Sequence, residues 1–406
     1  MKVVVLGGLG IMGLAALVYM RKTPEVTHVT VVDRNDEALQ KMVSWLNDSI
    51  GQARFTGTVV DVTDYEGLVG VLRGNDLVMN CAAMAGHYFS ATKAALEAGA
   101  NYMDVGSFGE EDAQLSLDAE FKKKRLVAVL GMGFTPGLVN IAAVYGIERL
   151  ATVDKVDIRW AIVDIVPPSM HTRALYGGFA WWGYIHNYFS VPSTRWEHGR
   201  RVVSPPRHHP EQFAFKGPIG TTEVAGWPGY DSDSLAKLFP QIPNIESKAA
   251  VGIEEAKKWT LLKELGFNST DPININGQWV SPWAVLESLL NNQPAETKTP
   301  PDIRHGGAVM VSGTEKNGKK TDYRIDIWPS ETLVQEHKDL GVAAYAGPRQ
   351  IFRAGTAMGS AGILVARGKT KDKGVFYPES AFAAKDFLEQ EAASGIRVEI
   401  SKTTAL

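Results

Sequence analysis

The sequence holds a single cysteine, Cys81, among its 406 residues. One cysteine cannot form an intramolecular disulfide, and such scarcity is typical of a chain kept in a reducing compartment. Glycines interrupt the two most apolar stretches, residues 1–20 and 355–366, so neither is a continuous run long enough to cross a bilayer. We therefore expect a soluble, cytoplasmic protein that does not bind membranes.

The chain also lacks an excess of either charge. It has 42 lysines and arginines against 45 aspartates and glutamates, which gives a net charge of −3. This balance does not favour nucleic-acid binding. His208 and His209 stand together, but no further histidine or cysteine follows at the spacing of metal ligands, so we expect no metal.

What is abundant is an alternation of strand and helix patterns. The first third of the chain alternates short β-branched runs, such as residues 2–6 and 28–32, with helical segments. This order predicts a parallel sheet with right-handed crossovers. Longer strands at 156–164, 307–314 and 322–328 indicate a second domain with a mixed or antiparallel sheet. Helical patterns then return near the C-terminus, and we expect that segment to pack against the first domain.

A glycine motif follows the first predicted strand. Gly8-Leu9-Gly10-Ile11-Met12-Gly13 fits the G-x-G-x-x-G fingerprint of dinucleotide-binding domains. In that fingerprint the first glycine permits a tight turn, the second lets the backbone approach the pyrophosphate, and the third packs helix on strand. The helix that begins here would offer its N-terminal N–H groups to the phosphates. The alternative is a glycine-rich turn without a ligand.

The second predicted strand ends at Asp33, twenty residues beyond Gly13, where the fingerprint requires an acid. A carboxylate there accepts hydrogen bonds from the ribose hydroxyls of NAD and repels the 2′-phosphate of NADP. The adjacent Arg34 would stack on adenine or bind that phosphate. We therefore predict NAD as the cofactor, with NADP as the less favoured alternative.

The third and fourth predicted strands end in further candidate residues for cofactor binding. Asp61 and Val62 are placed beside the adenine, although a carboxylate at this point can also cap the next helix. Asn80, Cys81 and Ala82 end the fourth strand at the ligand-binding edge, where small side chains would admit the nicotinamide ribose. For Cys81 we expect a buried filler rather than a nucleophile, since no cation is placed to lower its pKa.

Four stretches give the chain a resemblance to a known family. They are "VVVLGGLGIMG", "NYMDVGS", "GMGFTPGLVN" and the closing "GVFYPESAFAAKDFLEQEAASGIRVE". With these stretches the chain resembles the saccharopine dehydrogenase-like family. The resemblance implies an α/β fold in which residues 1–136 and 345–406 form a Rossmann dinucleotide-binding domain completed by C-terminal helices. Residues 137–344 would form an inserted α+β domain with a mixed sheet for substrate binding and dimerisation.

The same resemblance implies roles at the nicotinamide end. Asp104 and the segment 136–140 would face the nicotinamide, with Pro136 counted among the cofactor-binding residues. Asp104 is our candidate catalytic residue, holding a substrate ammonium or accepting its proton. The alternative is a structural carboxylate bonded to backbone N–H groups. Asn140 would touch the cofactor or cap the helix that follows.

The substrate side is less defined. An amino-acid substrate needs a cation for its carboxylate, and Arg195, Arg200 and Arg201 are candidates, although each also suits a solvated hairpin. The aromatic segment 177–189 surrounds His186 and suits a core, a subunit interface or a pocket wall. The family's usual pattern has a histidine close to the glycine of "VGIEEAKK", whereas here Ile253 follows Gly252.

These observations predict an NAD(P)-dependent oxidoreductase that acts on a CH–NH or CH–NH2 group of an amino acid. Lysine 6-dehydrogenase-like oxidative deamination is the first expectation, and a saccharopine or carboxynorspermidine type of reductase is the second. A nicotinamide-binding regulator without turnover is the alternative from another class. We expect a small-molecule amino-acid substrate and a homodimer.

Overall fold

The computed structural model describes residues 1–82, 84, 86–106, 109–170, 172, 175, 185, 187, 190–251, 256–294, 298–299, 301–342 and 352–404. Contacts between residues group the chain into two compact units. The first unit comprises Met1–Val153 and Val309–Leu406, and the second comprises Asp154–Ala308. The described helices include none that is long and apolar enough to cross a membrane.

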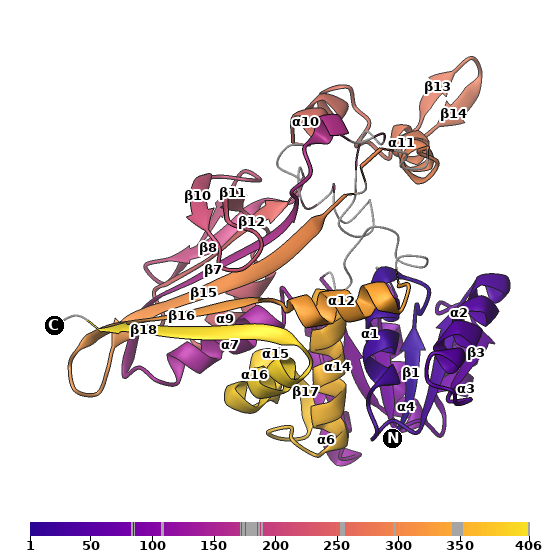
Figure 1. The fold of residues 1–406 in the computed structure, drawn as a ribbon, viewed down its shortest axis with the longest axis horizontal. Coiled ribbons are helices and arrows are strands. Elements are labelled where there is room, and N and C mark those ends of the chain that lie inside the picture. The colour runs from indigo at the N-terminus through magenta and orange to yellow at the C-terminus, as the bar shows by residue number, and fades with distance from the viewer. Residues whose placement is uncertain are drawn as a thin grey trace. The chain divides into compact units, whose positions relative to one another are not determined.

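Within the described residues, the first unit is built on a parallel sheet of seven strands, shown in Figure 1. In spatial order the strands are β17 (Gly374–Phe376), β6 (Val127–Val129), β5 (Asn101–Asp104), β4 (Leu77–Asn80), β1 (Lys2–Leu6), β2 (His28–Asp33) and β3 (Phe55–Val59). The central strands are almost wholly buried, as near-continuous apolar runs in a parallel sheet require. This order is that of the doubly wound dinucleotide-binding fold, so the predicted fold class is confirmed.

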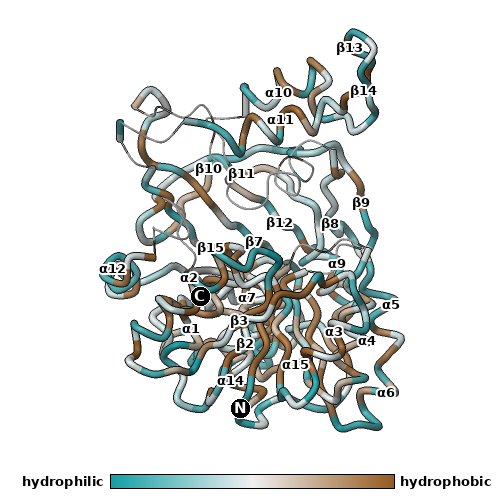
Figure 2. Tube along the Cα trace, turned by 90° about the vertical axis from the view of Figure 1, so that its right-hand side faces the viewer, coloured by the Kyte–Doolittle hydropathy of each residue, from teal (hydrophilic) through white to brown (hydrophobic). Residues whose placement is uncertain are grey.

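Helices alternate with these strands along the chain. They are α1 (Ile11–Arg21), α2 (Asp36–Asp48), α3 (Tyr65–Leu72), α4 (Tyr88–Ala98), α5 (Glu111–Leu115), α6 (Asp118–Lys123) and α7 (Leu138–Ile147). The C-terminal segment adds α12 (Glu331–Asp339), α14 (Phe352–Ala366), α15 (Pro378–Ala381) and α16 (Ala384–Ala393). The hydrophobic segments of this unit gather in its interior, with hydrophilic segments around them (Figure 2).

Helix α14 lies directly against α1, although more than 300 residues separate them in the sequence (Figure 1). Two glycines of α14, four residues apart, make this close approach. A Cβ on Gly355 would lie 2.0 Å from the Cβ of Ala15, and one on Gly359 would lie 2.2 Å from Cδ1 of Tyr19. The expectation that the C-terminal helices pack against the first domain is therefore confirmed.

The second large sheet is mixed and has nine strands among the residues that the structure describes. Its main path is β10 (Glu211–Ala214), β11 (Thr221–Gly226), β12 (Asn244–Val251), β7 (Thr152–Asp164), β15 (Ile303–Thr314), β16 (Lys320–Pro329) and β18 (Ile396–Thr404). Strand β8 (Ser193–Glu197) pairs with β12 and with β9 (Arg200–Ser204). Most pairs are antiparallel, but β12 and β7 are parallel, which confirms the mixed sheet.

In the described part of the chain, the second unit also contains a 3-10 helix, three α-helices and a small hairpin. These are the 3-10 turn Pro168–Met170, α9 (Tyr230–Leu238), α10 (Ala256–Glu264), α11 (Pro282–Asn291) and the two-stranded sheet of β13 (Ile273–Ile275) and β14 (Gln278–Val280). Ile253 and all of the aromatic segment 177–189 except Ile185 and Asn187 lie outside the described residues, so the predictions made for them stay predictions.

The compact units have other boundaries than the domains that we expected. Residues 137–153 and 309–344, which we placed in the second domain, group with the first unit. Two strands, β17 and β18, were not indicated by the sequence pattern, and the second of them helps to explain why residues 309–344 group with the first unit. Strand β17 completes the parallel sheet beside β6, and β18 pairs along the whole of β16. The assignment of substrate binding and dimerisation to residues 137–344 stays a prediction.

Candidate functional site

The predicted cofactor residues follow the carboxyl ends of four strands of the parallel sheet. Strand β1 lies between β2 and β4, and the strand order reverses at the β1–β4 pair. In open α/β sheets, ligands bind outside the carboxyl ends of the strands at such a switch point. The glycine motif follows β1, Asp33 ends β2, Asn80 ends β4 and Asp104 ends β5. The topology therefore brings these candidates to one edge of the first unit.

The glycine loop shows which of its glycines the protein itself requires. A Cβ on Gly8 would lie 2.2 Å from Cγ1 of Val31, and one on Gly13 would lie 2.2 Å from the carbonyl oxygen of Gly7. Both positions are therefore closed to larger residues by packing within the protein. A Cβ on Gly10 would meet only that same carbonyl oxygen, at 3.2 Å. The space beside Gly10 is thus left open at the point where the fingerprint brings the pyrophosphate close.

Helix α1 begins at the glycine loop without a side-chain cap. Its N-cap is Gly10, with extended backbone, and no side chain of the described residues accepts a hydrogen bond there. The first turn, Ile11 and Met12, is half-buried and carries no acid. A helix N-terminus of this kind offers N–H groups and a positive dipole end to an anion. This arrangement fits the phosphates of a dinucleotide.

Asp33 is tied to the glycine loop. Its Oδ2 accepts a hydrogen bond from the N–H of Leu9 at 3.0 Å, and its Oδ1 accepts one from the N–H of Arg34 at 2.8 Å. The carboxylate is half-buried, and Arg34 is exposed. The loop and the acid of the fingerprint are thus held together before any ligand arrives, and both residues lie where the sequence placed them.

The candidate residues after β3, Asp61 and Val62, both make structural contacts within the first unit. Asp61 folds back on its own chain and accepts hydrogen bonds from the N–H and the hydroxyl of Thr63, at 2.9 and 2.8 Å. These bonds lower the pKa of the exposed Asp61 carboxyl. The cap of α3 is supplied by Asp64, which accepts from the N–H of Gly67. Val62 is half-buried against the core under the sheet. The helix-cap alternative for Asp61 is therefore wrong, and its contact with adenine stays a prediction.

The end of β4 is held by a buried amide. Asn80 donates to the Tyr102 hydroxyl at 2.9 Å and to the Met84 sulfur at 3.0 Å, and accepts from the N–H of Ala82. Its side chain has no exposed surface. Ala82 closes against the first loop, because a Cβ on Gly7 would lie 2.7 Å from its Cα. The amide of Asn80 therefore shapes the loop, and the cofactor contacts of Asn80 and Ala82 stay predictions.

Cys81 is buried, and burial raises the pKa of its thiol to about 12, with a smaller contribution from the nearby Asp104 carboxylate. Since the thiolate is the reactive form, we expect the native protein to react very slowly with Ellman's reagent at neutral pH. The unfolded chain should react at once, with one reactive thiol per chain. Rapid reaction of the Cys81 thiol in the folded protein would contradict both its burial and its role as a buried filler residue.

Asp104 is wholly buried at the end of β5. Its Oδ1 accepts from the N–H of Gly131 at 2.7 Å, and its Oδ2 accepts from Nε2 of Gln114 at 2.9 Å. Burial outweighs these hydrogen bonds and raises the pKa of the carboxyl to about 6. The contacts match the structural alternative, whereas a pKa near neutrality suits proton exchange. The catalytic role of Asp104 stays a prediction.

The segment after β6 contains the residues that cap the start of α7. Asn140 accepts from the N–H of Gly137 at 3.2 Å and donates to Glu379 on α15 at 3.4 Å. Gly137 has φ +127, and a Cβ there would lie 2.1 Å from the carbonyl oxygen of Gly133, so only glycine fits. The buried Asn140 therefore caps the helix, as one alternative proposed. Pro136 is half-buried beside it, and its cofactor contact stays a prediction.

Sequence patterns missed two polar residues near this edge. Gln114, on the short helix α5, links Asp104 to the Thr92 hydroxyl. Glu110 accepts from the N–H groups of Tyr88 and Phe89 and so satisfies the start of α4. The acidic run "GEED" was a signal for the second of these, but nothing in the sequence around Gln114 distinguishes it from a surface residue.

Two of the three arginines proposed for the substrate, Arg195 and Arg201, already have carboxylate partners within the second unit, and for Arg200 the substrate role stays a prediction. Arg195 is buried and pairs with Glu197 at 2.6 Å, and its guanidinium also lies 3.0 Å from Nε2 of His208. Arg201 forms a bidentate contact with Asp233. These pairs match the structural alternative that accompanied the proposal. Burial and the Arg195 charge lower the pKa of His208 to about 4, so it stays neutral near pH 7.

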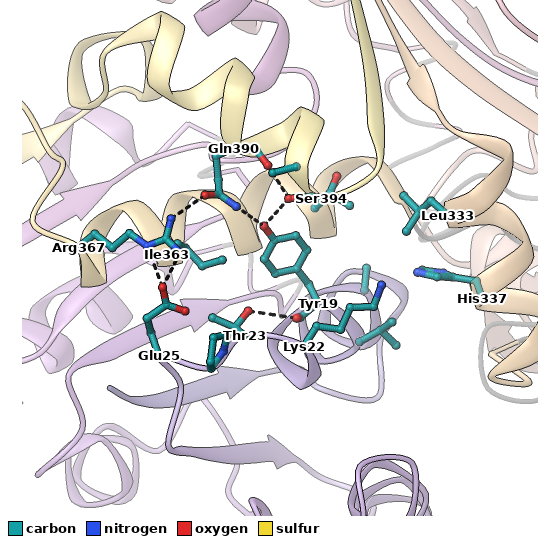
Figure 3. A pocket seen from close by; sticks show the side chains of 15 residues that line it. Tyr19, Lys22, Thr23, Glu25, Leu333, His337, Ile363, Arg367, Gln390 and Ser394 are labelled. Carbon is teal, nitrogen blue, oxygen red and sulfur yellow. Dashed lines mark hydrogen bonds and ion pairs between the residues drawn. The ribbon is translucent and has the colours of Figure 1, made fainter.

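A cavity of about 220 Å³ lies at the C-terminal end of α1 (Figure 3). The Tyr19 hydroxyl is hydrogen-bonded there to Ser394 and Gln390. The cations that line it are already paired, Lys22 with Glu336 and Arg367 with Glu25. Because the glycine motif stands at the other end of α1, this cavity is not part of the dinucleotide site.

Comparisons with known proteins agree with this geometry. The family model described as the saccharopine dehydrogenase NADP binding domain matches residues 3–129. A carboxynorspermidine synthase of Vibrio alginolyticus is 24% identical over 385 residues, which cover 89% of this chain and 85% of that protein. A carboxyaminopropylagmatine dehydrogenase of Synechocystis is 21% identical and covers 81% of each chain. Among solved structures, a saccharopine dehydrogenase (L-Glu forming) of Saccharomyces cerevisiae matches 99% of both chains, with TM-score 0.71 and 13% identity.

The fold and the glycine motif thus define a Rossmann domain of the dinucleotide-binding type and a second, mixed sheet, and the named relatives support an NAD(P)-dependent oxidoreductase. The resemblance to the saccharopine dehydrogenase-like family is confirmed, since the model of that family's NADP-binding domain matches residues 3–129.

Proposed function

We propose that this protein is an NAD(P)H-dependent reductase that joins an amine to a small amino-acid aldehyde through a new carbon–nitrogen bond. The observation that carries the proposal is the coverage of the curated relatives, which spans at least 81% of their length and therefore reaches beyond the dinucleotide domain. Their names describe a polyamine or agmatine that carries a carboxylated group. This favours the reductase alternative. Lysine 6-dehydrogenase-like deamination stays a prediction that these relatives do not specifically support.

The chemistry has two parts. Condensation of the amine with the aldehyde releases water and forms an imine, and addition of one hydride and one proton then gives the secondary amine. When bound, the reduced nicotinamide supplies the hydride. The chain's own residues hold and orient the cofactor. The open space at Gly10 and the start of α1 bind the pyrophosphate, and Asp33 accepts hydrogen bonds from the ribose hydroxyls.

Asp104 is our candidate for the group that exchanges the proton. Its pKa of about 6 lies near the usual working pH, where a general acid or base is most effective. To act directly, its carboxyl must give up one of its present partners, Gly131 or Gln114, and reach the substrate nitrogen.

A panel of substrates tests the proposed reaction. NADH and NADPH are offered separately with pairs of an aliphatic diamine or agmatine and an amino-acid semialdehyde, and the absorbance of the reduced nicotinamide is followed. Oxidation of lysine with NAD is the second arm. Turnover only in the first arm supports the proposal, and turnover only in the second supports deamination. Cofactor binding by calorimetry without turnover in any arm would leave the regulator alternative.

We propose NAD as the preferred cofactor, on the strength of the carboxylate at Asp33. Replacing it with alanine should shift the ratio of kcat/KM for NADH over NADPH toward NADPH by about tenfold, because roughly 1.4 kcal/mol of repulsion toward a 2′-phosphate is removed. Asp48→Ala, at the far end of α2, makes the same change in net charge and should leave the ratio unaltered. An equal ratio in all three proteins would remove Asp33 from cofactor selection.

A further inference from the structure

The side chain of Gln114 is a buried amide of which only one end is hydrogen-bonded. It has no exposed surface, and its Nε2 donates to Oγ1 of Thr92 at 2.7 Å and to Oδ2 of Asp104 at 2.9 Å. Its Oε1 is buried as well, and none of the described residues donates a hydrogen bond to it. Native proteins rarely leave a buried amide oxygen unsatisfied, because the hydration that it has lost is not replaced.

The groups around the Asp104 carboxyl are arranged for its ionised form. Gly131 donates to Oδ1, Gln114 donates to Oδ2, and the Tyr102 hydroxyl adds a third hydrogen bond. An ionised carboxylate only accepts hydrogen bonds, so each of these contacts suits it. The protonated carboxyl carries an O–H group instead, and this group needs an acceptor. Both forms matter near neutral pH, because burial raises the pKa of Asp104 to about 6.

The amide oxygen of Gln114 is the best placed acceptor for that proton. The N–H of Gly131 cannot accept, and the Tyr102 oxygen already accepts from Nδ2 of Asn80 at 2.9 Å. Oε1 of Gln114 accepts nothing from the described residues. A half-turn of the terminal amide exchanges Oε1 with Nε2 at almost unchanged shape, which brings the free oxygen to Oδ2 of Asp104.

Thr92 is compatible with both orientations of the amide. Its hydroxyl now donates to the carbonyl oxygen of Tyr88 at 2.9 Å and accepts from Nε2 of Gln114. Because a hydroxyl can rotate, Thr92 can donate to Oε1 after the half-turn. Each orientation then leaves one atom of the buried amide without a partner, Oε1 in the first and Nε2 in the second. The two orientations are therefore similar in cost, and the charge on Asp104 decides between them.

The other titratable groups that face Asp104 do not neutralise it. Among the described residues they are Cys81 after β4, Tyr88 on α4, Tyr102 on β5 and Glu111 on α5. Burial raises the pKa of the thiol and of both tyrosine hydroxyls, so these three stay protonated near pH 7. The charge of Glu111 adds to the raised pKa of Asp104. None of the four is a cation, so hydrogen bonds govern the proton on Asp104.

We propose that Gln114 is a positioning residue whose side-chain amide turns with the charge of Asp104. It donates through Nε2 to the ionised carboxylate and accepts through Oε1 from the protonated carboxyl. Asp104 thus keeps a partner at Oδ2 in both forms and exchanges its proton while the backbone stays in place. The inference deepens the proton exchange proposed above, but its test needs neither substrate nor cofactor, so failure of the proposed reaction would leave it standing.

Gln114→Met distinguishes an amide that turns from one that only donates. Methionine has a similar length and removes both ends of the amide. An amide that turns stabilises both forms of Asp104, so its loss should move the midpoint of the Asp104 titration by less than about one pH unit. A fixed donor stabilises only the ionised form, so its loss should raise the midpoint by about one unit or more. That larger rise would overturn the proposal.

The midpoint is read from the pH dependence of the free energy of unfolding of the full chain. Each protein is compared with the same protein carrying Asp104→Asn, and the difference isolates the titration of this carboxyl. Tyr102→Phe is the matched control. It removes a hydrogen bond that serves the ionised form alone, so it should raise the midpoint by about one unit.

Nuclear magnetic resonance on the wild type gives a second readout that no loss of folding can imitate. The side-chain NH2 of Gln114 is identified by its absence from the spectrum of the Gln114→Glu protein, which keeps the shape of the side chain. Its nuclear Overhauser effect to the Thr92 methyl group should be strong at about pH 8 and severalfold weaker at about pH 5. An effect of equal strength at both pH values would overturn the proposal, because the amide would then keep one orientation.

Discussion

Valine in place of Gly10 is expected to abolish dinucleotide binding while the protein stays folded. The backbone at Gly10 has φ −73 and ψ 162, which valine adopts readily, and its Cβ would meet only one oxygen at 3.2 Å. The branched side chain would instead fill the space through which the pyrophosphate approaches the backbone. We expect the affinity for NADH to fall by about 100-fold, a loss of roughly 3 kcal/mol. Calorimetric titration measures it directly.

Two further glycine variants make this test specific. Gly13→Val should unfold the loop itself, because its Cβ would lie 2.2 Å from a carbonyl oxygen and 2.7 Å from Cα of Gly8. Its loss of binding should therefore come with a lower thermal midpoint. Gly70→Ala places a methyl group where no atom lies within 4 Å and should leave binding intact. Normal NADH affinity in the Gly10→Val protein would refute the proposed pyrophosphate position.

Asparagine at position 104 is expected to reduce turnover far more than cofactor affinity. The amide keeps the shape of the carboxyl but cannot exchange a proton, so kcat should fall by about two to four orders of magnitude. The pH dependence of stability provides a second measurement, because it reports on the same carboxyl whether or not the carboxyl takes part in the reaction.

The direction of that pH dependence follows from the raised pKa. The folded protein binds the Asp104 proton more tightly than the unfolded chain, with pKa values of about 6 and 3.8. The free energy of unfolding should therefore fall as pH rises from about 4 to about 6, by roughly 3 kcal/mol in total from this group. Asp104→Asn should remove that share of the slope. A flattened slope with near-native kcat would assign Asp104 a structural role only.

The sequence alone was sufficient to predict the features that depend on a local residue pattern. The alternation of apolar runs, the glycine motif and the spacing to Asp33 are all set within the first 33 residues, and the structure places them as predicted. The same reasoning could not choose between roles for Asp104 and Asn140. Their partners lie 27 and 239 residues away along the chain, at Gly131 and Glu379. Only tertiary structure brings such groups together.

Short strands were a second kind of feature that could not be predicted from the sequence. Strand β17 has three residues and β18 ends the described chain, and neither alternates cleanly between apolar and polar side chains. Their pairing partners, β6 and β16, define where each belongs. A strand whose burial is decided by a distant neighbour gives little periodic signal of its own. The predicted domain boundaries therefore rested only on those strands and helices that have a clear periodic pattern in the sequence.

The glycines of α14 set an order of events during biosynthesis. The helix that carries the dinucleotide motif, α1, is made among the first residues, but the surface that Gly355 and Gly359 cover stays open until their helix has been made. Domains generally fold as the chain emerges, N-terminal parts first. Here the second unit is synthesised in full before the first can close. The nascent chain must therefore carry an incomplete nucleotide-binding domain through most of translation, with an apolar flank of α1 exposed to chaperones.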